Sequence, residues 1–354
     1  MYLCYDTNVL SAYVVPVVLR KQYSLLNRKC SHRKQLPSFR SIRCVAEKPS
    51  GEKSTSAKEL VEKLKSLDPQ KDVKLYQQLK RRIRHISKAI PLQVDNEPVS
   101  VIYEDDHILV VNKPSGISIS PRHRFLGGTL LNRLIGYLGY TPHVCHRLDM
   151  ETSGLVLFAK HPTSARKIHQ QFCSHQVEKL YLAIVYGIPQ QTYFQVCAPI
   201  GVDPERKISR KISNNGKEAL SQFLLASSCK ELNCSLVIAM PLTGRTHQLR
   251  IHLHYAGHPI IGDLLYQDTS KYGNQKLCHM NNESRADCWK HLKLHAWKLR
   301  FNHPLTGRKQ TYEALPEQDF IQLLDILRLP SPRDRILSTQ MSLYPSFSKW
   351  LDIV

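Results

Sequence analysis

The chain has 354 residues, of which 42% are hydrophobic, so it can bury a core for one large domain or two smaller ones. Its formal charge of +21 at pH 7 points to a polyanionic partner, with nucleic acid first and an anionic membrane second. No run of about 18 apolar residues is present, which excludes a membrane-spanning helix. The ten cysteines form no C-x-x-C pair, which favours reduced, mostly buried thiols.

Residues 1–48 differ in composition from the rest of the chain. They hold nine Lys or Arg and two acidic residues, and they are otherwise dominated by serine and small apolar residues. This composition is typical of an organelle transit peptide, and Ile42–Ala46 resembles a plastid processing site. We therefore expect a chloroplast protein, with the mitochondrion as the alternative location. A basic arm that is never cleaved is the other interpretation.

Residues 49–97 read as a polar linker followed by a basic helical extension. Apolar residues recur at helical spacing over residues 57–90, and basic residues fill the gaps between them, as in Lys80–Arg84. The extension is either a helical hairpin that touches phosphate or a solvated helix face.

From residue 98 onward the sequence changes to short strands and turns. Most connections between the strands are too short for crossover helices. The pattern predicts an α+β domain over residues 98–330, with a largely antiparallel mixed sheet and flanking helices, and a C-terminal tail over residues 331–354. Strand patterns occur at residues 99–103, 107–112, 155–159, 180–186, 222–226, 234–240 and 292–301, and helical patterns at 162–171 and 246–255.

The segment Cys145–Lys160 places charged or titratable residues directly before a buried strand. A carboxylate in that position is costly unless it is paired and hydrogen-bonded. The candidate partners of Asp149 are the arginines of the segment Leu242–Arg250, and Arg245, which follows a Thr-Gly turn at the start of a helix, would keep it ionised. A fixed, ionised carboxylate suits a nucleophile or a base better than a general acid.

Two other patterns can be set aside. Val111–Ser115 resembles the guanine-reading Asn-Lys-x-Asp of GTPases, but the required acid is a serine and no phosphate-binding loop exists. The second pattern is a group of Cys and His residues that does not repeat a zinc-ligand spacing. We therefore expect no metal and no cofactor. That group is His247, His252, His254 and His258, with Cys288, His291 and His295 further along.

The segment His146–Gly154 resembles the H-R-L-D-x-x-T-S-G signature of the RluA-type pseudouridine synthases. The resemblance covers about residues 98–315. Residues 57–97 do not read as the S4 RNA-binding domain that many members carry, so S4-bearing relatives do not identify the substrate. Four further segments match family elements in the right order, and they are Asp106–Gly116, Val177–Gly187, Leu242–His252 and Gly257–Asp263.

The resemblance implies a pseudouridine synthase fold with a central RNA-binding catalytic cleft, and an isomerase that works without a cofactor. It implies that Asp149 is the nucleophile or base, that Tyr181 stacks on an extruded uracil, and that Arg245 pairs with Asp149. It also suggests that Arg147 fills the gap left by a flipped base. The substrate contacts expected from the motifs are Arg147, His146, Thr152, Leu249 and Arg250.

The expected partner is a structured RNA that contains uridine, either rRNA or tRNA, and we expect a monomer that does not bind a membrane. One alternative is a catalytically inactive, basic RNA-binding protein of the same fold. Another is a nucleosidase or glycosidase, which would need a second acid beside Asp149, and Glu151 is the local candidate.

Overall fold

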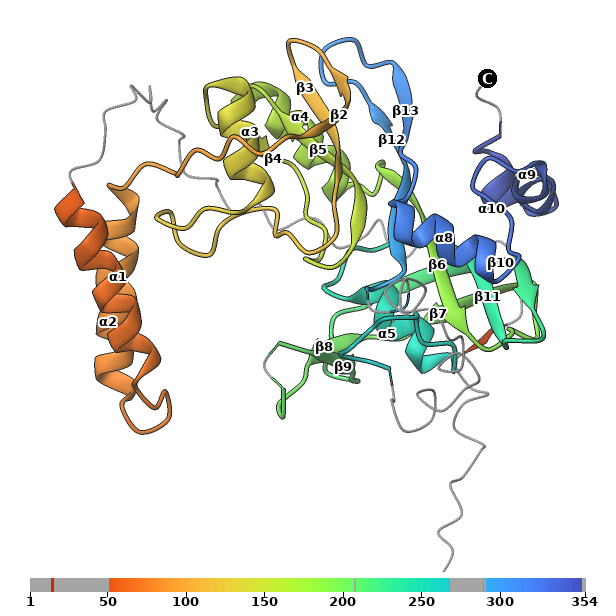
Figure 1. Cartoon of the computed structure of the whole chain (residues 1–354), viewed down its shortest axis with the longest axis horizontal. Helices are drawn as coiled ribbons and strands as arrows, with labels where there is room; N and C mark the ends of the chain where they lie inside the picture. Colours follow the sequence, from red (N-terminus) through yellow and green to blue (C-terminus); the bar gives the residue numbers. More distant parts are fainter. Residues whose placement is uncertain (1–13, 16–50, 207, 268–288, 290, 352–354) are drawn as a thin grey trace, which may run out of the picture. The chain divides into compact units, whose positions relative to one another are not determined.

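The computed structural model describes residues 14–15, 51–206, 208–267, 289 and 291–351 (Figure 1). These residues form two compact units. The sheet unit comprises residues 100–116 and 145–351 together with the strand β1 (Val14–Val15), and the hairpin unit comprises residues 51–99 and 117–144. Apart from the two residues of β1, the expected transit peptide lies outside the described residues.

One long sheet dominates the sheet unit. Its strand order is β1-β7-β10-β11-β6-β12-β5-β3-β2, with β13 paired to β12. These pairs are antiparallel except for β12 with β5, which confirms the largely antiparallel mixed sheet predicted from the short connections. Beyond β1, the strands are β2 (Ser100–Glu104), β3 (Ile108–Lys113), β5 (Ser153–Ala159), β6 (Glu178–Tyr186), β7 (Tyr193–Cys197), β10 (Leu220–Cys229), β11 (Cys234–Pro241), β12 (Leu294–Asn302) and β13 (Lys309–Glu313).

Helices and a short ribbon complete the sheet unit. The ribbon is an antiparallel pair, β8 (Ile200–Val202) and β9 (Arg210–Ile212). The helices predicted near residues 162–171 and 246–255 are confirmed as α4 and α5. The helices are α4 (Pro162–Cys173), α5 (Gln248–Tyr255), α8 (Gln318–Ile326), α9 (Arg335–Ser342) and α10 (Pro345–Ser348).

Strand β6 separates two hydrophobic cores. Successive side chains of a strand point to opposite faces of the sheet. Leu180, Leu182 and Ile184 pack in one core with residues of α8, α9 and α10 (Figure 1). Tyr181 and Ala183 face the other core, to which α5 contributes. The period of two therefore places Tyr181 on the α5 side of the sheet.

The C-terminal segment belongs to the first of these cores. By sequence, residues 331–354 read as a tail, but the described part forms α9 and α10 and buries Leu337, Met341, Phe347 and Trp350. The guanidinium of Arg300 lies 4.2 Å from the centre of the Trp350 ring. Exposure of these large apolar side chains to water is unfavourable, so the short helices pack them against the sheet.

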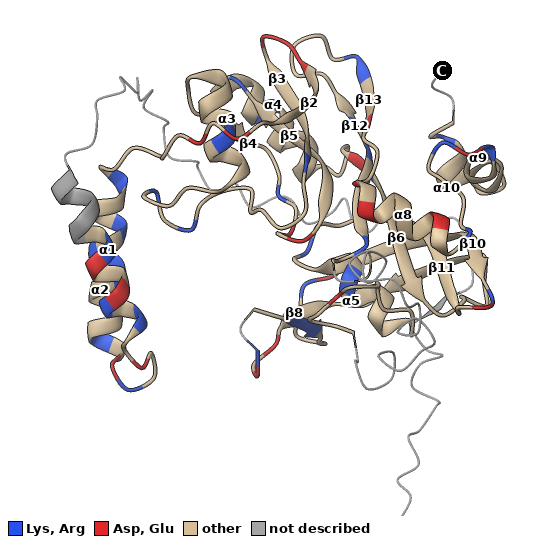
Figure 2. Ribbon diagram, in the orientation of Figure 1, with Lys and Arg blue, Asp and Glu red and all other residues tan. Residues whose placement is uncertain are grey.

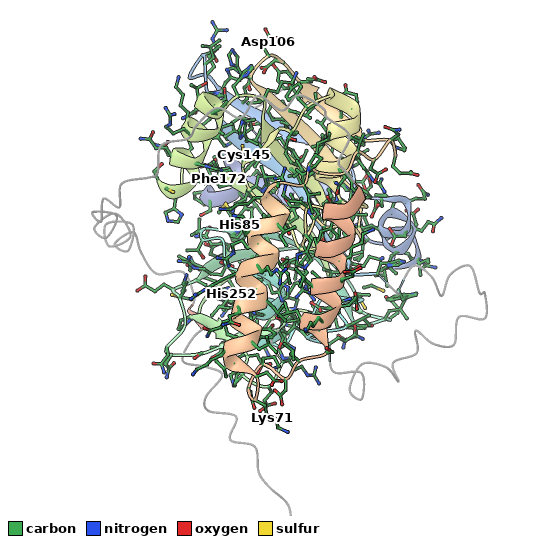
Figure 3. The ribbon with its side chains drawn as sticks, turned by 90° about the vertical axis from the view of Figure 1, so that its left-hand side faces the viewer. Lys71, His85, Asp106, Cys145, Phe172 and His252 are labelled. Atoms are coloured by element: carbon green, nitrogen blue, oxygen red, sulfur yellow. The ribbon has the colours of Figure 1, made fainter. Side chains whose placement is uncertain are left out.

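A third core fixes the start of the Cys145–Lys160 segment. Cys145 and the partly buried Phe172 of α4 pack there with Leu155 and Leu157 of β5 (Figure 3). Burial raises the pKa of the Cys145 thiol to about 12, so this thiol is a structural, unreactive one.

The hairpin unit contains α1 (Gly51–Lys65), α2 (Val73–Lys88), α3 (Leu130–Leu138) and the short strand β4 (His143–Val144). The helical extension predicted over residues 57–90 is confirmed as α1 and α2, which lie side by side with Lys71 in the turn between them (Figure 3). Their small core includes Ala57, Val61 and Ile83 and receives Phe125 from a distant loop. Among the described helices of both units, none is long and apolar enough to cross a membrane.

Candidate active site

A pocket of about 350 Å³ opens in the sheet unit, where three of the motif segments meet. Residues 145–149 and Thr152 form one wall, Lys179 and Tyr181 of β6 the floor, and residues 243–250 the opposite wall. Segments separated by about a hundred positions in sequence therefore form one cavity. All the candidate residues from the sequence line it: Asp149, Tyr181, Arg245, Arg147, His146, Thr152, Leu249 and Arg250.

His146 attaches the Asp149 loop to the sheet. Its Nε2 accepts a hydrogen bond from the backbone N–H of Leu157 at 3.0 Å, and its ring lies 5.1 Å from that of Phe172. Burial, with a contribution from the charge of Lys179, lowers the pKa of His146 to about 3. His146 is therefore neutral at physiological pH, and its Nε2 is occupied by the protein backbone.

The other end of the same loop is held by the segment that resembles a guanine-reading motif. Lys113 Nζ donates to the carbonyl of Met150 at 2.8 Å, and Ser115 Oγ donates to the carbonyl of Glu151 at 2.7 Å. Lys113 is fully buried, and burial lowers the pKa of its amine to about 8. Sequence reasoning missed this positioning role, because the motif gives no sign of which carbonyls it reaches.

Asp149 faces Arg250 and His247. Its Oδ2 lies 3.6 Å from Nη1 of Arg250, and its Oδ1 lies 3.9 Å from Nε2 of His247. Arg250 is held in turn by Asp263, with Nε to Oδ2 at 2.8 Å and Nη2 to Oδ1 at 2.6 Å. Because Asp263 takes up two of the guanidinium nitrogens, the remaining Nη1 is directed toward Asp149.

The expected pairing of Arg245 with Asp149 is wrong. The Arg245 side chain is exposed, and its Nε donates to the carbonyl of Glu218 at 2.9 Å. The cause is the local backbone: the Gln248 side chain accepts from the Arg245 N–H, and α5 begins only at Gln248. Arg245 therefore remains in the turn at the rim of the pocket, whereas Arg250 lies on the buried face of the helix.

Tyr181 and Leu249 form the apolar part of the pocket. Both are buried and both belong to the core beneath α5. Burial, followed by the charge of Asp149, raises the pKa of the Tyr181 hydroxyl, so this hydroxyl stays protonated. A flat ring beside a carboxylate, with an apolar wall behind it, can accommodate a planar base.

His247 was considered in the sequence only as a metal ligand, and the structure gives it a different environment. It adopts a left-handed backbone conformation with φ of 58°, and its Nδ1 lies 2.7 Å from the hydroxyl of Tyr266. Burial is the main cause of its lowered pKa, and the nearby charge of Asp149 opposes it. Within the described residues, no three His, Cys, Asp or Glu side chains gather as a metal site.

Lys179 is the second pocket residue that sequence reasoning missed. It precedes Tyr181 by two positions on β6, so both side chains point to the same face of the sheet. Burial lowers the pKa of its amine to about 8. The signal in the sequence was the period of two, which places Lys179 beside Tyr181.

Arg147 and Thr152 lie on the same wall in different settings. Arg147 is exposed and forms no ion pair with any described residue, whereas Thr152 is buried and its hydroxyl has no hydrogen-bond partner among them. The Thr152 N–H donates to the backbone carbonyl of Asp149 at 3.2 Å. The Asp149 carboxylate therefore does not cap this amide and remains directed to the pocket.

Comparison with known proteins gives a consistent result. The family described as RNA pseudouridylate synthase matches residues 107–255. An uncharacterized RNA pseudouridine synthase of Aquifex aeolicus is 31% identical over 262 residues, which cover 71% of this chain and 81% of the relative. The ribosomal large subunit pseudouridine synthase D of Nitrosomonas europaea is 33% identical over 255 residues, covering 69% and 67%. The solved structure of human RNA pseudouridylate synthase domain containing 4 superposes with a TM-score of 0.53 at 29% identity, covering 66% of this chain and 95% of the human one.

Proposed function

This chain belongs to the RluA-type family of RNA pseudouridine synthases, and from this premise we propose that it isomerises specific uridines in RNA with Asp149 as its acting carboxylate. The observation that carries the proposal is the content of the pocket. Among the described residues that line it, Asp149 is the only one with a carboxylate, and it lies beside Tyr181, His247 and Arg250.

A single carboxylate favours isomerisation over hydrolysis. Hydrolases that break glycosidic bonds commonly use two carboxyl groups, one to protonate the leaving group and one to attack or to activate water. The local candidate for a second acid, Glu151, is absent from the lining of the pocket, and its backbone carbonyl is bound by Ser115. Uracil that is detached and recaptured within the pocket requires neither water nor a second acid.

The pocket residues take complementary roles in this proposal. Asp149 acts as a nucleophile toward the ribose or as the base that permits elimination of uracil. Arg250, fixed by its contact with Asp263, orients the carboxylate of Asp149. Tyr181 stacks on the extruded base, and its protonated hydroxyl can donate a hydrogen bond. Arg147, exposed and without an ion pair in the described chain, can enter the gap left in the RNA.

The alternative of an inactive RNA-binding protein is disfavoured by the same geometry. Loss of chemistry would relax the need for Asp149, Tyr181 and a buried guanidinium in one cavity, and all three are present. The substrate we favour is ribosomal RNA, because one relative is named for the ribosomal large subunit. Transfer RNA is the second candidate.

The test is Asp149→Asn, with Glu151→Gln as the matched control outside the pocket. We expect Asp149→Asn to abolish pseudouridine formation on ribosomal RNA while RNA affinity stays within about threefold, since a nearly isosteric amide can neither attack nor accept the proton. Glu151→Gln should retain most of the activity. Pseudouridine mapping on RNA treated with each variant gives the measurement, and substantial turnover by Asp149→Asn would exclude this role.

We further propose that residues 1–48 direct the protein to the plastid, with the mitochondrion as the alternative. The support is the excess of basic over acidic residues in this segment. Residues 1–60 fused to a fluorescent protein should enter the organelle, whereas a diffuse cytosolic signal would identify the segment as a basic arm.

A further inference from the structure

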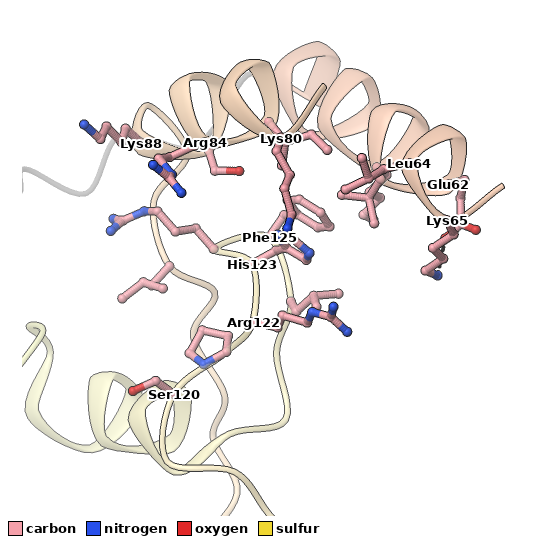
Figure 4. A pocket seen from close by; sticks show the side chains of 18 of the residues that line it. Glu62, Leu64, Lys65, Lys80, Arg84, Lys88, Ser120, Arg122, His123 and Phe125 are labelled. Carbon is pink, nitrogen blue, oxygen red and sulfur yellow. Dashed lines mark hydrogen bonds and ion pairs between the residues drawn. The ribbon is translucent and has the colours of Figure 1, made fainter. Parts of the chain in front are cut away.

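The hairpin unit contains a groove that the proposed chemistry does not use. Its volume is about 1170 Å³, and residues of α1, of α2 and of the segment 120–126 line it (Figure 4). All the described residues that line it lie in the hairpin unit.

The rim of the groove is strongly basic. Among the described lining residues, one acidic residue, Glu62, accompanies seven basic ones, and its carboxylate is bonded to Lys65 at 2.6 Å. Helix α2 itself has six Lys or Arg and no Asp or Glu, which is visible as a series of blue segments in Figure 2. Such an arrangement attracts a chain of negative charges. The basic residues in the lining are Lys58, Lys65, Lys80, Arg84, Lys88, Arg122 and Arg124.

The walls of the groove are apolar and aromatic. Phe125 is buried in the core of the hairpin unit, and the His123 ring stacks on it at 5.3 Å with an interplanar angle of 3° (Figure 4). Tyr76 lies under the amine of Lys80, 4.8 Å from the centre of its ring. Burial and then the charges of Arg122 and Lys65 lower the pKa of His123, so its ring is neutral at physiological pH. The partly exposed rings of His123 and Tyr76, which lie among basic side chains, match the alternation of bases and phosphates in a single strand.

We propose that this groove binds single-stranded RNA that flanks the target uridine. The inference rests on the proposed function only in that the substrate is RNA. An anionic membrane is the weaker candidate, because Leu79 and Ile83 of α2 are buried, and its exposed apolar residues Val73 and Leu75 lie in the first turn and do not line the groove. The groove is concave and rimmed by positive charge, which suits a flexible polyanion.

The experiment compares two triple variants of the full chain that remove the same charge. Lys80→Gln with Arg84→Gln and Arg122→Gln neutralises the rim of the groove. Lys74→Gln with Arg81→Gln and Arg82→Gln neutralises exposed residues of α2 that do not line it. The probes are a labelled single-stranded RNA of about 12 nucleotides, a double-stranded RNA of the same length, and phosphatidylserine vesicles.

We expect the groove triple to raise the dissociation constant for single-stranded RNA about tenfold or more and to reduce its salt dependence, because three phosphate contacts are lost. The control triple should change the dissociation constant for single-stranded RNA less than threefold. Tyr76→Leu should weaken binding of single-stranded RNA more than binding of the duplex, because a stacking surface is lost.

Equal losses in the two triples would overturn the inference, as would a groove triple that loses only vesicle binding. The rate of pseudouridine formation at saturating RNA separates the groove proposal from the proposed isomerase function. If the wild type makes pseudouridine and both triples bind alike, only the groove proposal fails. If RNA binds in the groove but no pseudouridine forms on any tested RNA, only the proposed function fails.

Discussion

Arg250 links two carboxylates that differ in burial. Asp263 is 1% exposed and is held by two short hydrogen bonds, whereas Asp149 faces the pocket at 3.6 Å. Burial alone would lower the pKa of Arg250, but the hydrogen bonds and charge of Asp263, followed by the charge of Asp149, more than offset it and raise the pKa. One guanidinium therefore serves both the fold and the candidate active site.

Replacement of Arg250 by Met should reduce both stability and turnover. The buried Asp263 would lose its partner, which costs about 3–5 kcal/mol of unfolding free energy. Arg250→Lys keeps the charge but not the two-pronged contact, so the rate should fall strongly with a smaller loss of stability. Urea unfolding and single-turnover rates give the two measurements.

The matched control for these variants is Arg245→Met, which removes an exposed guanidinium five positions away in the same segment. Its cost in stability should stay below about 1 kcal/mol, and its rate should remain near that of the wild type. If Arg245→Met instead abolishes turnover while Arg250→Met does not, the pairing seen in the structure does not operate during catalysis.

At the scale of single residues, the sequence predicted which residues lie together in the site but not which of them form ion pairs. Asp149, Tyr181 and the Arg245–Arg250 segment could be placed in one site because each lies in a recognisable motif. The choice between two arginines depends on where α5 begins, and the Gln248 side chain, which binds Thr243 Oγ1 and the Arg245 N–H, decides that. Such a side-chain contact leaves no periodic pattern in the sequence.

At the scale of elements, Gly154 determines how closely β5 approaches β12. Its φ is +113°, and a Cβ at this position would lie 2.4 Å from the backbone oxygen of Ala296. Next to it, the Ser153 hydroxyl lies 2.9 Å from Nδ1 of His295, whose Nε2 lies 2.8 Å from the carbonyl of Ala314. The Thr-Ser-Gly end of the signature is therefore required for packing, and it fixes the loop that carries Asp149.

Gly154→Ala should destabilise the sheet unit by more than about 2 kcal/mol, because a backbone clash adds to the strain of the left-handed conformation. Gly116→Ala is the control: its φ is +80°, but no atom lies within 4 Å of the added Cβ. That variant should cost only about 1 kcal/mol. Thermal unfolding of the two variants gives the measurement. Similar losses of stability in both would show that the β5–β12 contact can relax.

The loop anchors on β3 illustrate what the sequence could not provide at this scale. The strand at residues 107–112 was predicted from its apolar run, and it is confirmed as β3. The contacts of Lys113 and Ser115 with the carbonyls of Met150 and Glu151 join residues more than thirty positions apart. Only the pairing of β3 with β5 brings them together.

At the scale of the whole molecule, the C-terminal helices complete a core rather than extending from it. Their short sequences and mixed polarity resembled a tail, because the partners of Phe347 and Trp350 lie on strands far away in sequence. Trp350→Ala should cost about 3–5 kcal/mol, since this ring is fully buried and lies under Arg300. An unchanged melting temperature in that variant would show that residues 331–351 pack only weakly on the sheet.

Three neutral histidines tie the stability of the sheet unit to pH. Burial lowers the pKa of His252 and His295 to about 4 and that of His146 to about 3. Their hydrogen bonds agree with neutral rings: His252 Nδ1 can accept from the Ser221 hydroxyl while its Nε2 donates to the carbonyl of Ala198. A proton added to such a ring would leave a charge in the interior, and no described Asp or Glu forms an ion pair with any of the three rings.

The direction of the pH effect follows from which state binds more protons. Between the unfolded pKa of 6.5 and the folded values near 4, the unfolded chain binds protons that the folded chain excludes, so stability falls as the pH drops through this window. Each histidine contributes up to about 1.4 kcal/mol per pH unit to the slope of the unfolding free energy against pH.

His295→Gln should reduce this slope between pH 6.5 and 5, whatever its effect on stability at pH 7. His169→Gln, on the exposed face of α4, should leave the slope unchanged. Urea unfolding at several pH values gives the slopes. Equal slopes for wild type and His295→Gln would mean that this ring gains its proton in the folded protein, and that the polar chain from Ser153 to Ala314 tolerates a charge.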